Sequence, residues 1–459
     1  MKTLAQIAAE LQGYDAQALR ADDVLRFLEK LVSPIQGIGD VPLFEALGRV
    51  LAADVISPFD VPPHDNSAMD GFAFDGQQLG DAPLTLQIIG TAFAGKAWQG
   101  KVSKGQCVKI MTGAIMPTGL DTVVPQEFVA VNASAIAIPP QLLKPGDNRR
   151  HRGEDLTQGK AALLKGELLT PARLGLAASL GFKTMPCYRQ IKVAYFSTGD
   201  EILSLGEPPR EGAVYDSNRF VMFGLLTRLG CKVIDMGVVR DDPQALEAAF
   251  TQGALQADAI ITSGGVSVGE ADHTKAMMKK LGDVEFWRIA MRPGRPMAVG
   301  YIEKPAESLI SSIKSDSSPY EISASSYENN SIPANESSGG SVGCILFGLP
   351  GNPVAVMVTF LAFVRPALLQ MMGANPVAQP LLQARSQEAM RKKPGRTEYQ
   401  RGWVSTSADG ACQVKTTGNQ GSGVLSSMAQ ANGLIVLHHD QGNVAVGDTV
   451  QVLMFDGAI

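Results

Sequence analysis

Four short runs in this sequence place glycine or proline beside acids and hydroxyls, residue types that together can bind an anionic ligand. They are DNSAMDG at 65–71, STGDE at 197–201, TSGGVSVGE at 262–270 and LPGNP at 349–353. Each run stands where a strand should end, a position at which α/β proteins present backbone N–H groups and carboxylates. Together the four runs predict a site for a phosphate-rich or oxyanion ligand.

Acids follow three of the predicted strands. STGDE ends in the adjacent carboxylates Asp200 and Glu201, Asp241 ends the strand-like CKVIDMGVVR, and Asp272 follows TSGGVSVGE. Because such strand ends can lie side by side, Glu201, Asp241 and Asp272 could meet around Mg²⁺ and bridge it to a phosphate. The simpler interpretation is that Asp200 caps a helix and that each other acid is a solvated cap.

The glycine-rich run at 262–270 is predicted to form a nest of backbone N–H groups that binds an anion. Its candidate contacts are Ser263, Gly264, Gly265 and Ser267. The run matches neither GxxxxGK[ST] nor GxGxxG, which argues against a P-loop or a dinucleotide site.

The run LPGNP is predicted to join a strand to a helix that has Asn352 at its N-cap. Pro350, Gly351 and Pro353 shape this turn. A glycine turn that leads into a helix N-terminus is an anion site, although it could also be only a tight connection.

A stiff, largely apolar segment carries three cations. FWRIAMRPGRP places Arg288, Arg292 and Arg295 within eight residues. Guanidinium groups suit forked contacts to phosphate or other oxyanion oxygens, and the alternative is a solvated basic surface.

A second group of acids, hydroxyls and bases stands in the N-terminal half, within DNSAMDG, MTGA and RRHRGED. It includes Asp70, Thr112, Arg150 and Asp155. These side chains have no obvious role in a hydrophobic core, so we expect them to act where they meet a second protein surface.

Composition limits the classes of partner. The 459 residues carry a net charge of −5, which argues against general binding of nucleic acid or of an anionic membrane. The five cysteines form no CxxC pair, which argues against a zinc site. The longest apolar run, PVAVMVTFLAFVRPALLQMM, is expected to be broken by Arg365 and Pro366. The N-terminus does not resemble a secretory signal, so we expect a cytoplasmic protein.

The order of patterns predicts an α/β multidomain protein. A helical linker domain is expected from 1–58 and 156–189, with helical spacing at 21–31 and a second helix-like stretch at FEALGRVLAADV. Short apolar runs predict a small β-rich domain at 59–155. Strand and helix alternation predicts a doubly wound, parallel sheet at 190–376, and a C-terminal β-barrel is expected at 377–459. The Ser- and Asn-rich stretch at 303–342 is expected to be a flexible insertion, tolerated rather than partner-binding.

These motifs, in this order, resemble the molybdopterin molybdenumtransferase family, which includes bacterial MoeA and the gephyrin E domain. The resemblance covers nearly the whole chain apart from 303–342. It implies that 190–376 is a molybdopterin-binding domain. It also implies an enzyme that takes adenylylated molybdopterin and molybdate, cleaves the pyrophosphate link with Mg²⁺, releases AMP and leaves molybdenum on the dithiolene.

The resemblance further implies an elongated homodimer with its active site near the interface. DNSAMDG and RGED of one subunit would then reach the molybdopterin-binding domain of the other. Molybdopterin adenylyltransferase and other proteins of the cofactor pathway are implied as partners.

Carried over position by position, the resemblance implies a role in activity or its pocket for a set of residues. These are Asp70, Thr112, Asp155, Glu201, Asp241, Asp272, Pro350 and Pro353, with Arg150 as a matching cation. The family often has lysines where this chain has Arg288 and Arg292. Since a guanidinium cannot act as a base, we expect anion binding rather than proton transfer there.

Two other functions stay open at this point. One is adenylyl transfer to molybdopterin, one step earlier, because the same domain fold performs that reaction. The other is a scaffold role of the kind found in gephyrin.

Overall fold

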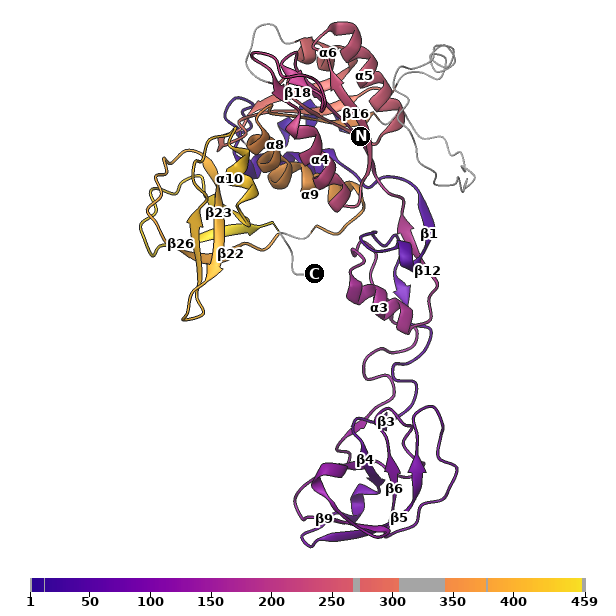
Figure 1. Ribbon diagram of the computed structural model, residues 1–459. Coiled ribbons are helices and arrows are strands. Elements are labelled where there is room, and N and C mark those ends of the chain that lie inside the picture. Colours follow the sequence, from indigo (N-terminus) through magenta and orange to yellow (C-terminus); the bar gives the residue numbers. More distant parts are fainter. Residues whose placement is uncertain (1, 12, 267–272, 305–342, 377–378, 456–459) are drawn as a thin grey trace. The chain divides into compact units, whose positions relative to one another are not determined.

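The computed structural model of this protein describes residues 2–11, 13–266, 273–304, 343–376 and 379–455 (Figure 1). The chain divides into two compact units. The first comprises Met1–Ala52, Gly166–Pro171 and Thr184–Ile459, and the second comprises Ala53–Lys165 and Ala172–Lys183. This division cuts across the expected linker domain, so the four expected segments stay a prediction. The insertion expected at 303–342 lies outside the described residues from 305 onward.

A six-stranded sheet in the order β16-β13-β17-β21-β20-β18 forms the centre of the first unit. Its strands are β13 (Lys192–Thr198), β16 (Lys232–Val239), β17 (Ala259–Ser263), β18 (Gly282–Arg288), β20 (Pro296–Ile302) and β21 (Cys344–Leu349). The doubly wound sheet is confirmed with one difference, since β20 runs antiparallel to both β18 and β21. The seven residues between β18 and β20 are too few for the crossover helix that a parallel strand requires.

Helices cover both faces of this sheet. They are α4 (Ser217–Arg228), α5 (Pro243–Gln256), α6 (His273–Leu281), α8 (Pro353–Thr359) and α9 (Arg365–Met371). Alternate strand residues separate into two cores. Tyr195 and Phe347 pack with α4, α8 and α9, whereas Phe196 and Leu346 pack with α5 and α6. Burial of both faces explains why these strands are almost continuously apolar.

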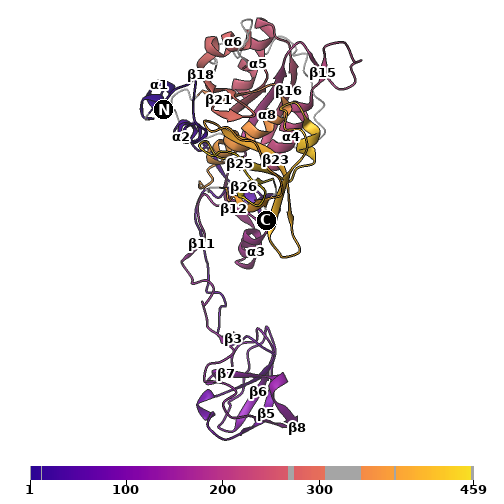
Figure 2. The same cartoon turned by 90° about the vertical axis from the view of Figure 1, so that its left-hand side faces the viewer.

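The two N-terminal helices, α1 (Leu4–Ala9) and α2 (Ala21–Leu31), pack into the same core as α8 and α9 (Figure 2). Helical spacing at 21–31 is confirmed, and Phe27 packs edge-on against Trp287 with ring centroids 4.9 Å apart. The prediction of a second helix at FEALGRVLAADV is wrong. Only the 3₁₀ turn η1 (Leu43–Glu45) forms there, and the chain then reverses at Gly48 (φ 73°). β1 (Ile38–Pro42) pairs with β12 (Thr184–Tyr188).

The apolar run from Pro353 to Met371 is one helix, long and apolar enough to cross a membrane by length and composition. Arg365 and Pro366 interrupt the apolar composition of this run, as expected, but they do not end the helix. A π-helical turn, η4 (Phe360–Val364), directly precedes the proline and lets the helix continue. Because 61% of the apolar window is buried, the helix is a core element of this unit and only weak evidence for a membrane span.

The predicted C-terminal barrel is confirmed. Its strands are β22 (Leu382–Ser386), β23 (Thr397–Thr406), β24 (Cys412–Thr416), β25 (Gly433–Leu437) and β26 (Thr449–Met454). The sheet closes because β25 pairs with both β26 and β23. β19 (Met291–Arg292) joins β23, and α10 (Leu425–Ala429) follows the turn at 418–424. β14 (Ile202–Leu203) and β15 (Val214–Tyr215) form a separate small pair.

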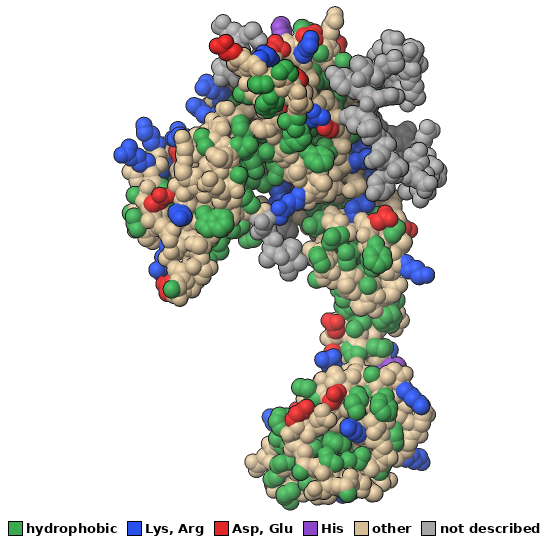
Figure 3. Space-filling model, viewed as in Figure 1, with side chains coloured by type: hydrophobic (Ala, Val, Ile, Leu, Met, Phe, Trp, Pro, Cys, Tyr) green, Lys and Arg blue, Asp and Glu red, His purple; other side chains and the backbone are tan. Residues whose placement is uncertain are grey.

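The second unit is the predicted small β domain, with a sheet in the order β7-β4-β6-β5-β9-β8. Its strands are β4 (Gly71–Phe74), β5 (Leu84–Ala92), β6 (Gln106–Ile110), β7 (Thr122–Pro125), β8 (Ala130–Asn132) and β9 (Ala135–Ile138), with short 3₁₀ turns η2 (Gly76–Gln78) and η3 (Gln126–Phe128). Two short pairs join β3 (Asn66–Ser67) to β10 (Arg149–Arg150) and β2 (Val55–Ile56) to β11 (Ala161–Leu163). α3 (Pro171–Ser179) forms within the helix-like run LTPARLGLAASLG at 169–181. In the view of Figure 3, acidic and basic side chains are interspersed among apolar ones.

Candidate active site

A cavity of about 1100 Å³ opens at the carboxyl ends of β13, β17 and β21. Parallel strands end at the same edge of a sheet, which is why motifs far apart in the sequence meet here. The barrel contributes the turn at 420–425 to the same cavity. The predicted site residues that line it are Glu201, Asp241, Ser263, Gly264, Gly265, Arg292, Pro350, Gly351 and Pro353.

Other predicted residues lie elsewhere. Ser267 and Asp272 fall outside the described residues. Arg288 is exposed at the end of β18 and does not line this cavity, so its contact with substrate stays a prediction. Asp70, Thr112, Arg150 and Asp155 belong to the small β domain.

The glycines of the 262–270 run are required by space and by backbone conformation. Gly264 and Gly265 have φ values of 97° and 65°. A Cβ on Gly264 would lie 2.3 Å from the carbonyl oxygen of Thr198, and one on Gly265 would lie 2.5 Å from the Thr274 side chain. The turn therefore packs against its neighbours in a way that only glycine allows.

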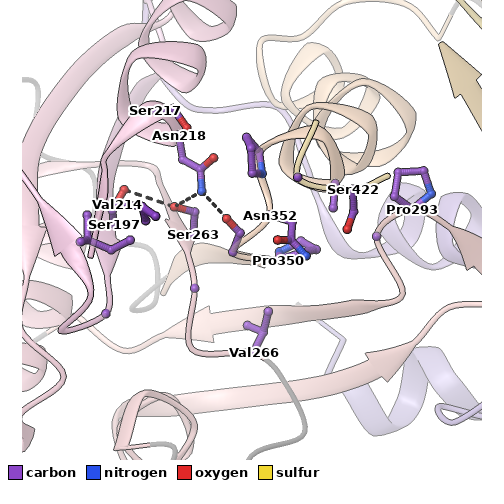
Figure 4. A pocket seen from close by; sticks show the side chains of 18 of the residues that line it. Ser197, Val214, Ser217, Asn218, Ser263, Val266, Pro293, Pro350, Asn352 and Ser422 are labelled. Atoms are coloured by element: carbon purple, nitrogen blue, oxygen red, sulfur yellow. Dashed lines mark hydrogen bonds between the residues drawn. The ribbon is translucent and has the colours of Figure 1, made fainter. Parts of the chain in front are cut away.

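A buried hydrogen-bond network underlies this turn (Figure 4). Tyr195 Oη lies 2.9 Å from Ser197 Oγ and 2.7 Å from Ser263 Oγ. Ser197 Oγ donates to Asp216 Oδ1 at 2.9 Å. Asn218 Nδ2 donates to the Gly351 carbonyl at 2.7 Å and, more weakly, to Ser263 Oγ at 3.4 Å. The network ties β13, β17, the start of α4 and the LPGNP turn into one cavity wall.

Asp216 ends this network and caps α4. Its Oδ1 also accepts from the Arg219 N–H at 3.0 Å. Burial raises the pKa of Asp216 above its ordinary value, although the hydrogen bonds from Arg219 and Ser197 act in the opposite direction. Burial likewise raises the pKa of Tyr195, which keeps its hydroxyl protonated as a donor.

The two described acids of the predicted metal site, Glu201 and Asp241, both line the cavity. Asp241 Oδ1 accepts from Thr274 Oγ1 at 3.2 Å. The alternative role for Asp200 is wrong, because the short strand β14 and no helix follows it. In contrast, Asp242 does cap α5 through the N–H groups of Gln244 and Ala245.

Within the described residues, no group of three or more His, Cys, Asp or Glu side chains is placed to hold a metal ion. The predicted triad stays untested, because its third member lies outside them. Mg²⁺ commonly takes only one or two protein carboxylates and completes its shell with water and phosphate oxygens. Glu201 and Asp241 are two carboxylates of this kind in the cavity lining.

Cations gather toward the barrel. Arg292 and Arg295 line the main cavity, and Arg292 also lines an adjoining cavity of about 200 Å³ together with Arg401. Arg401 is 1% exposed and donates to the carbonyls of residues 419–421 and to Ser427 Oγ. Burial and then the charge of Arg292 lower the pKa of Arg401 to about 10.

The LPGNP turn begins α8 as predicted, with Pro353 at the first helical position. Asn352 occupies the N-cap position without a side-chain capping bond. The Val354 N–H donates to the Ser422 carbonyl at 3.1 Å. One N–H of this helix start is therefore used for binding the barrel turn.

The small β domain brings its own three motifs together. Asp70 Oδ1 accepts from both the N–H and the hydroxyl of Thr112, each at 2.7 Å, and these bonds lower the pKa of Asp70. Ser67 exchanges backbone hydrogen bonds with Gly113 and Ala114. Arg150 pairs with Asn66 across β10 and β3. Asp70, Thr112, Arg150 and Asp155 are all exposed.

Sequence reasoning missed several residues of the cavity wall, including Asp216, Asn218, Thr274, Gln420 and Ser422. Asp216 carried a usable signal, since a helix that starts at Ser217 requires a cap at the preceding position. Asn218 carried none, because its partner Gly351 lies 133 residues away.

Comparisons with known proteins agree over most of the chain. Residues 19–181 match the model of the MoeA N-terminal region (domain I and II), residues 194–370 match a probable molybdopterin binding domain, and residues 383–455 match the MoeA C-terminal region (domain IV).

Named relatives align with most of the chain. The chain is 39% identical over 432 residues to the molybdopterin molybdenumtransferase of Haemophilus influenzae, which covers 94% of this chain and 97% of the relative. It is 32% identical over 422 residues to molybdopterin molybdenumtransferase 2 of Mycobacterium tuberculosis, with 90% and 94% covered. A solved structure, the molybdopterin biosynthesis moeA protein of Pyrococcus horikoshii, matches with a TM-score of 0.72 at 26% identity, covering 96% of this chain and 100% of that one. The chain therefore belongs to the molybdopterin molybdenumtransferase family.

Proposed function

We propose that this protein is a molybdopterin molybdenumtransferase. It transfers molybdenum from molybdate to adenylylated molybdopterin, with Mg²⁺-dependent release of AMP, and so completes molybdenum cofactor biosynthesis. The observation that carries the proposal is one cavity that contains both carboxylates (Glu201, Asp241) and guanidinium groups (Arg292, Arg295). Such a cavity suits a substrate pair of a phosphate ester and a small oxyanion. The names of its relatives support the same reaction.

The two kinds of charge suit different parts of the reaction. Figure 4 shows Ser197 and Val214 at one end of the cavity and Pro293, next to Arg292, at the other. Arg292 and Arg295 would bind molybdate through charge-assisted hydrogen bonds. Glu201 and Asp241 would hold Mg²⁺, which when bound neutralises phosphate charge and polarises the phosphorus–oxygen bond.

Position and charge, rather than a covalent intermediate, would supply the catalysis. Among the described cavity-lining residues there is neither a cysteine nor a histidine. Ser263 has Tyr195, Ser197 and Asn218 as hydrogen-bond partners, and none of these is a base that would activate it. The buried network instead holds the Gly264 turn and the Gly351 turn rigidly, which favours a fixed arrangement of the two substrates.

AMP release is the direct test. Purified protein is incubated with adenylylated molybdopterin, Mg²⁺ and molybdate, and with mixtures that lack one component. The expected result is AMP release that requires both molybdate and Mg²⁺ and yields a product that activates an apo-molybdoenzyme. Formation of adenylylated molybdopterin from ATP would instead favour adenylyl transfer, and tight binding without AMP release would favour a carrier or scaffold.

Arg292→Ala tests the oxyanion end of the cavity. We expect the KM for molybdate to rise about tenfold, as for the loss of one charge-assisted hydrogen bond, with a smaller effect on AMP binding. Arg26→Ala is the matched control, since that arginine makes only a surface ion pair with Asp23 on α2. Equal losses of molybdate use and AMP binding would contradict the assignment.

We also propose a cytoplasmic homodimer that works with molybdopterin adenylyltransferase and other proteins of the pathway. All five cysteines are unpaired, which supports a reducing compartment. The exposed motif at Asp70 and Thr112 supports a dimer, because its acids and hydroxyls are open to contact with a second surface.

Subunit mixing tests the dimer. Asp70→Asn and Asp241→Asn should each abolish activity alone. If Asp70 serves the site of the other subunit, a random mixture should regain about a quarter of the parent activity, since half of the dimers are mixed and each has one intact site. A monomer in sedimentation, or a mixture that stays inactive, would refute this arrangement.

A further inference from the structure

Two polar side chains at the start of α4 are almost fully buried and yet incompletely hydrogen-bonded. Asp216 is 4% exposed and Asn218 is 7% exposed. Asp216 Oδ2 and Asn218 Oδ1 have no hydrogen-bond partner among the described residues, and both residues line the cavity. Thr198 Oγ1, on the neighbouring strand end, is a third unpaired buried atom of the lining, and its hydroxyl can donate or accept. Buried polar atoms in folded proteins are nearly always paired, so two unpaired ones in a substrate cavity point to a ligand that pairs with them.

The hydrogen-bond network determines which atoms remain for that ligand. The Gly351 carbonyl can only accept, so the Asn218 amide must turn its nitrogen toward Gly351 and its oxygen away (Figure 4). Asp216 Oδ1 already accepts from the Ser197 hydroxyl and the Arg219 N–H. The two vacant atoms are therefore both acceptors, and a ligand group that fits them must present hydrogen-bond donors.

This requirement excludes the phosphate and oxyanion parts of a substrate, which are themselves acceptors and carry negative charge. The guanidinium of the neighbouring Arg219 is already engaged by both carboxylate oxygens of Asp235. A planar nitrogen heterocycle with adjacent N–H donors fits what remains.

We propose that Asp216 and Asn218 bind the N–H edge of the pterin ring, made of its lactam N–H and its exocyclic amino group. The inference rests on the proposed function and specifies how the substrate lies in the cavity. The pterin is held at the start of α4, and the oxyanion is held at the arginine end. In this arrangement the pterin supplies the hydrogen-bond partners of the two unpaired buried acceptors.

Asp216→Asn is the central variant. The asparagine keeps an oxygen for the Ser197 and Arg219 bonds and replaces the second oxygen with an N–H₂ group, so that a donor faces the donor edge of the pterin. Asp242→Asn is the matched control, because Asp242 caps α5 in the same way and is exposed outside the cavity. Asn218→Ala is a second variant that removes the other acceptor.

The probes are pterin itself (2-amino-4-oxopteridine), whose fluorescence reports binding, and AMP. We expect Asp216→Asn to weaken pterin binding by about tenfold or more and AMP binding by less than about twofold. Asn218→Ala should weaken pterin binding in the same direction, and Asp242→Asn should change neither. The parent should also bind pterin more tightly than the 2,4-dioxo analogue, which lacks the amino donor, and Asp216→Asn should lose this preference.

A variant that only destabilises the fold should weaken binding of pterin and of the 2,4-dioxo analogue alike. Loss of the preference for pterin over this analogue therefore indicates that Asp216 contacts the ligand. The proposal is overturned if the parent does not distinguish the two pteridines, or if Asp216→Asn weakens AMP and pterin equally. AMP release by the parent is measured in parallel. If the parent releases AMP but Asp216→Asn does not change pterin binding, only this subsite is refuted. If Asp216→Asn weakens pterin binding but the parent releases no AMP, the proposed reaction is refuted and the subsite stands.

Discussion

Asp70 in the small β domain and Asp216 in the α/β domain occupy similar local motifs and yet have opposite electrostatic environments. Asp70 is exposed, and two hydrogen bonds from Thr112 lower its pKa. Asp216 is buried, and desolvation raises its pKa even though it also accepts two hydrogen bonds. Residue type and local hydrogen bonding are thus alike in the two places, and burial decides the outcome.

The same contrast holds for two glycines that directly follow a hydroxyl residue of each hydrogen-bond network. Gly113 follows Thr112 and Gly264 follows Ser263, and both have positive φ values, 78° and 97°. A Cβ on Gly113 would meet nothing within 4 Å, whereas one on Gly264 would press on the Thr198 carbonyl. The small β domain therefore presents an open motif, and the α/β domain a closely packed one.

The largest expected effect is the loss of folding stability when each of the two glycines is replaced by alanine. Gly113→Ala should cost about 1 kcal/mol, because only left-handed backbone strain is added. Gly264→Ala should cost about 3 kcal/mol or more, since it adds a backbone clash in the cavity wall. Urea unfolding followed by hydrogen exchange, which separates the two units, measures both. Equal costs would show that the cavity wall yields more easily than its packing suggests.

A smaller effect with a sharper signature is the pH dependence of Asp216→Asn and Asp70→Asn. The folded-state pKa of Asp216 is raised, so its contribution to stability is present below the ordinary value of 3.8 and is lost as pH rises through the folded pKa. The folded-state pKa of Asp70 is lowered, so its contribution is present above 3.8 and is lost as pH falls through the folded pKa.

The difference in free energy of unfolding between each variant and the parent should therefore change with pH in opposite directions. For Asp216→Asn, the variant should become more stable relative to the parent as pH rises above about 4. For Asp70→Asn, the variant should become less stable relative to the parent as pH rises toward about 4 from below. Hydrogen exchange at a series of pH values measures the two trends. Trends of the same sign would mean that burial does not distinguish the two carboxylates.

The smallest expected effect is that of Thr112→Val on the pKa of Asp70. The variant removes the hydroxyl bond and keeps the backbone N–H bond, so the pKa should move part of the way toward its ordinary value. Thr112→Ser retains a hydroxyl and serves as the control. A ¹³C NMR titration of the Asp70 carboxyl measures the shift, and no difference between valine and serine would assign the whole effect to the backbone.

Much of the fold could be predicted because its signals are local. Asp242 followed by Pro243 marks the start of α5, and the apolar spacing of 21–31 marks α2. The helix expected at FEALGRVLAADV failed because Ala46, Val50 and Leu51 are buried by turns and by bridges to distant segments rather than along one helix face. Periodicity alone does not distinguish these two ways of burying the same side chains.

By itself, the sequence determined the strand-and-helix alternation, the four strand-end motifs and the family, because each of these depends on residues close together in the chain. Only the tertiary structure decided which motif residues share a cavity and which atoms there lack partners. Asn218 reaches Gly351 across 133 residues, and the cavity edge at Gln420 and Ser422 comes from the barrel. Burial and hydrogen-bond pairing depend on such distant contacts, and they, rather than residue type, determine the pKa and the binding capacity of a side chain.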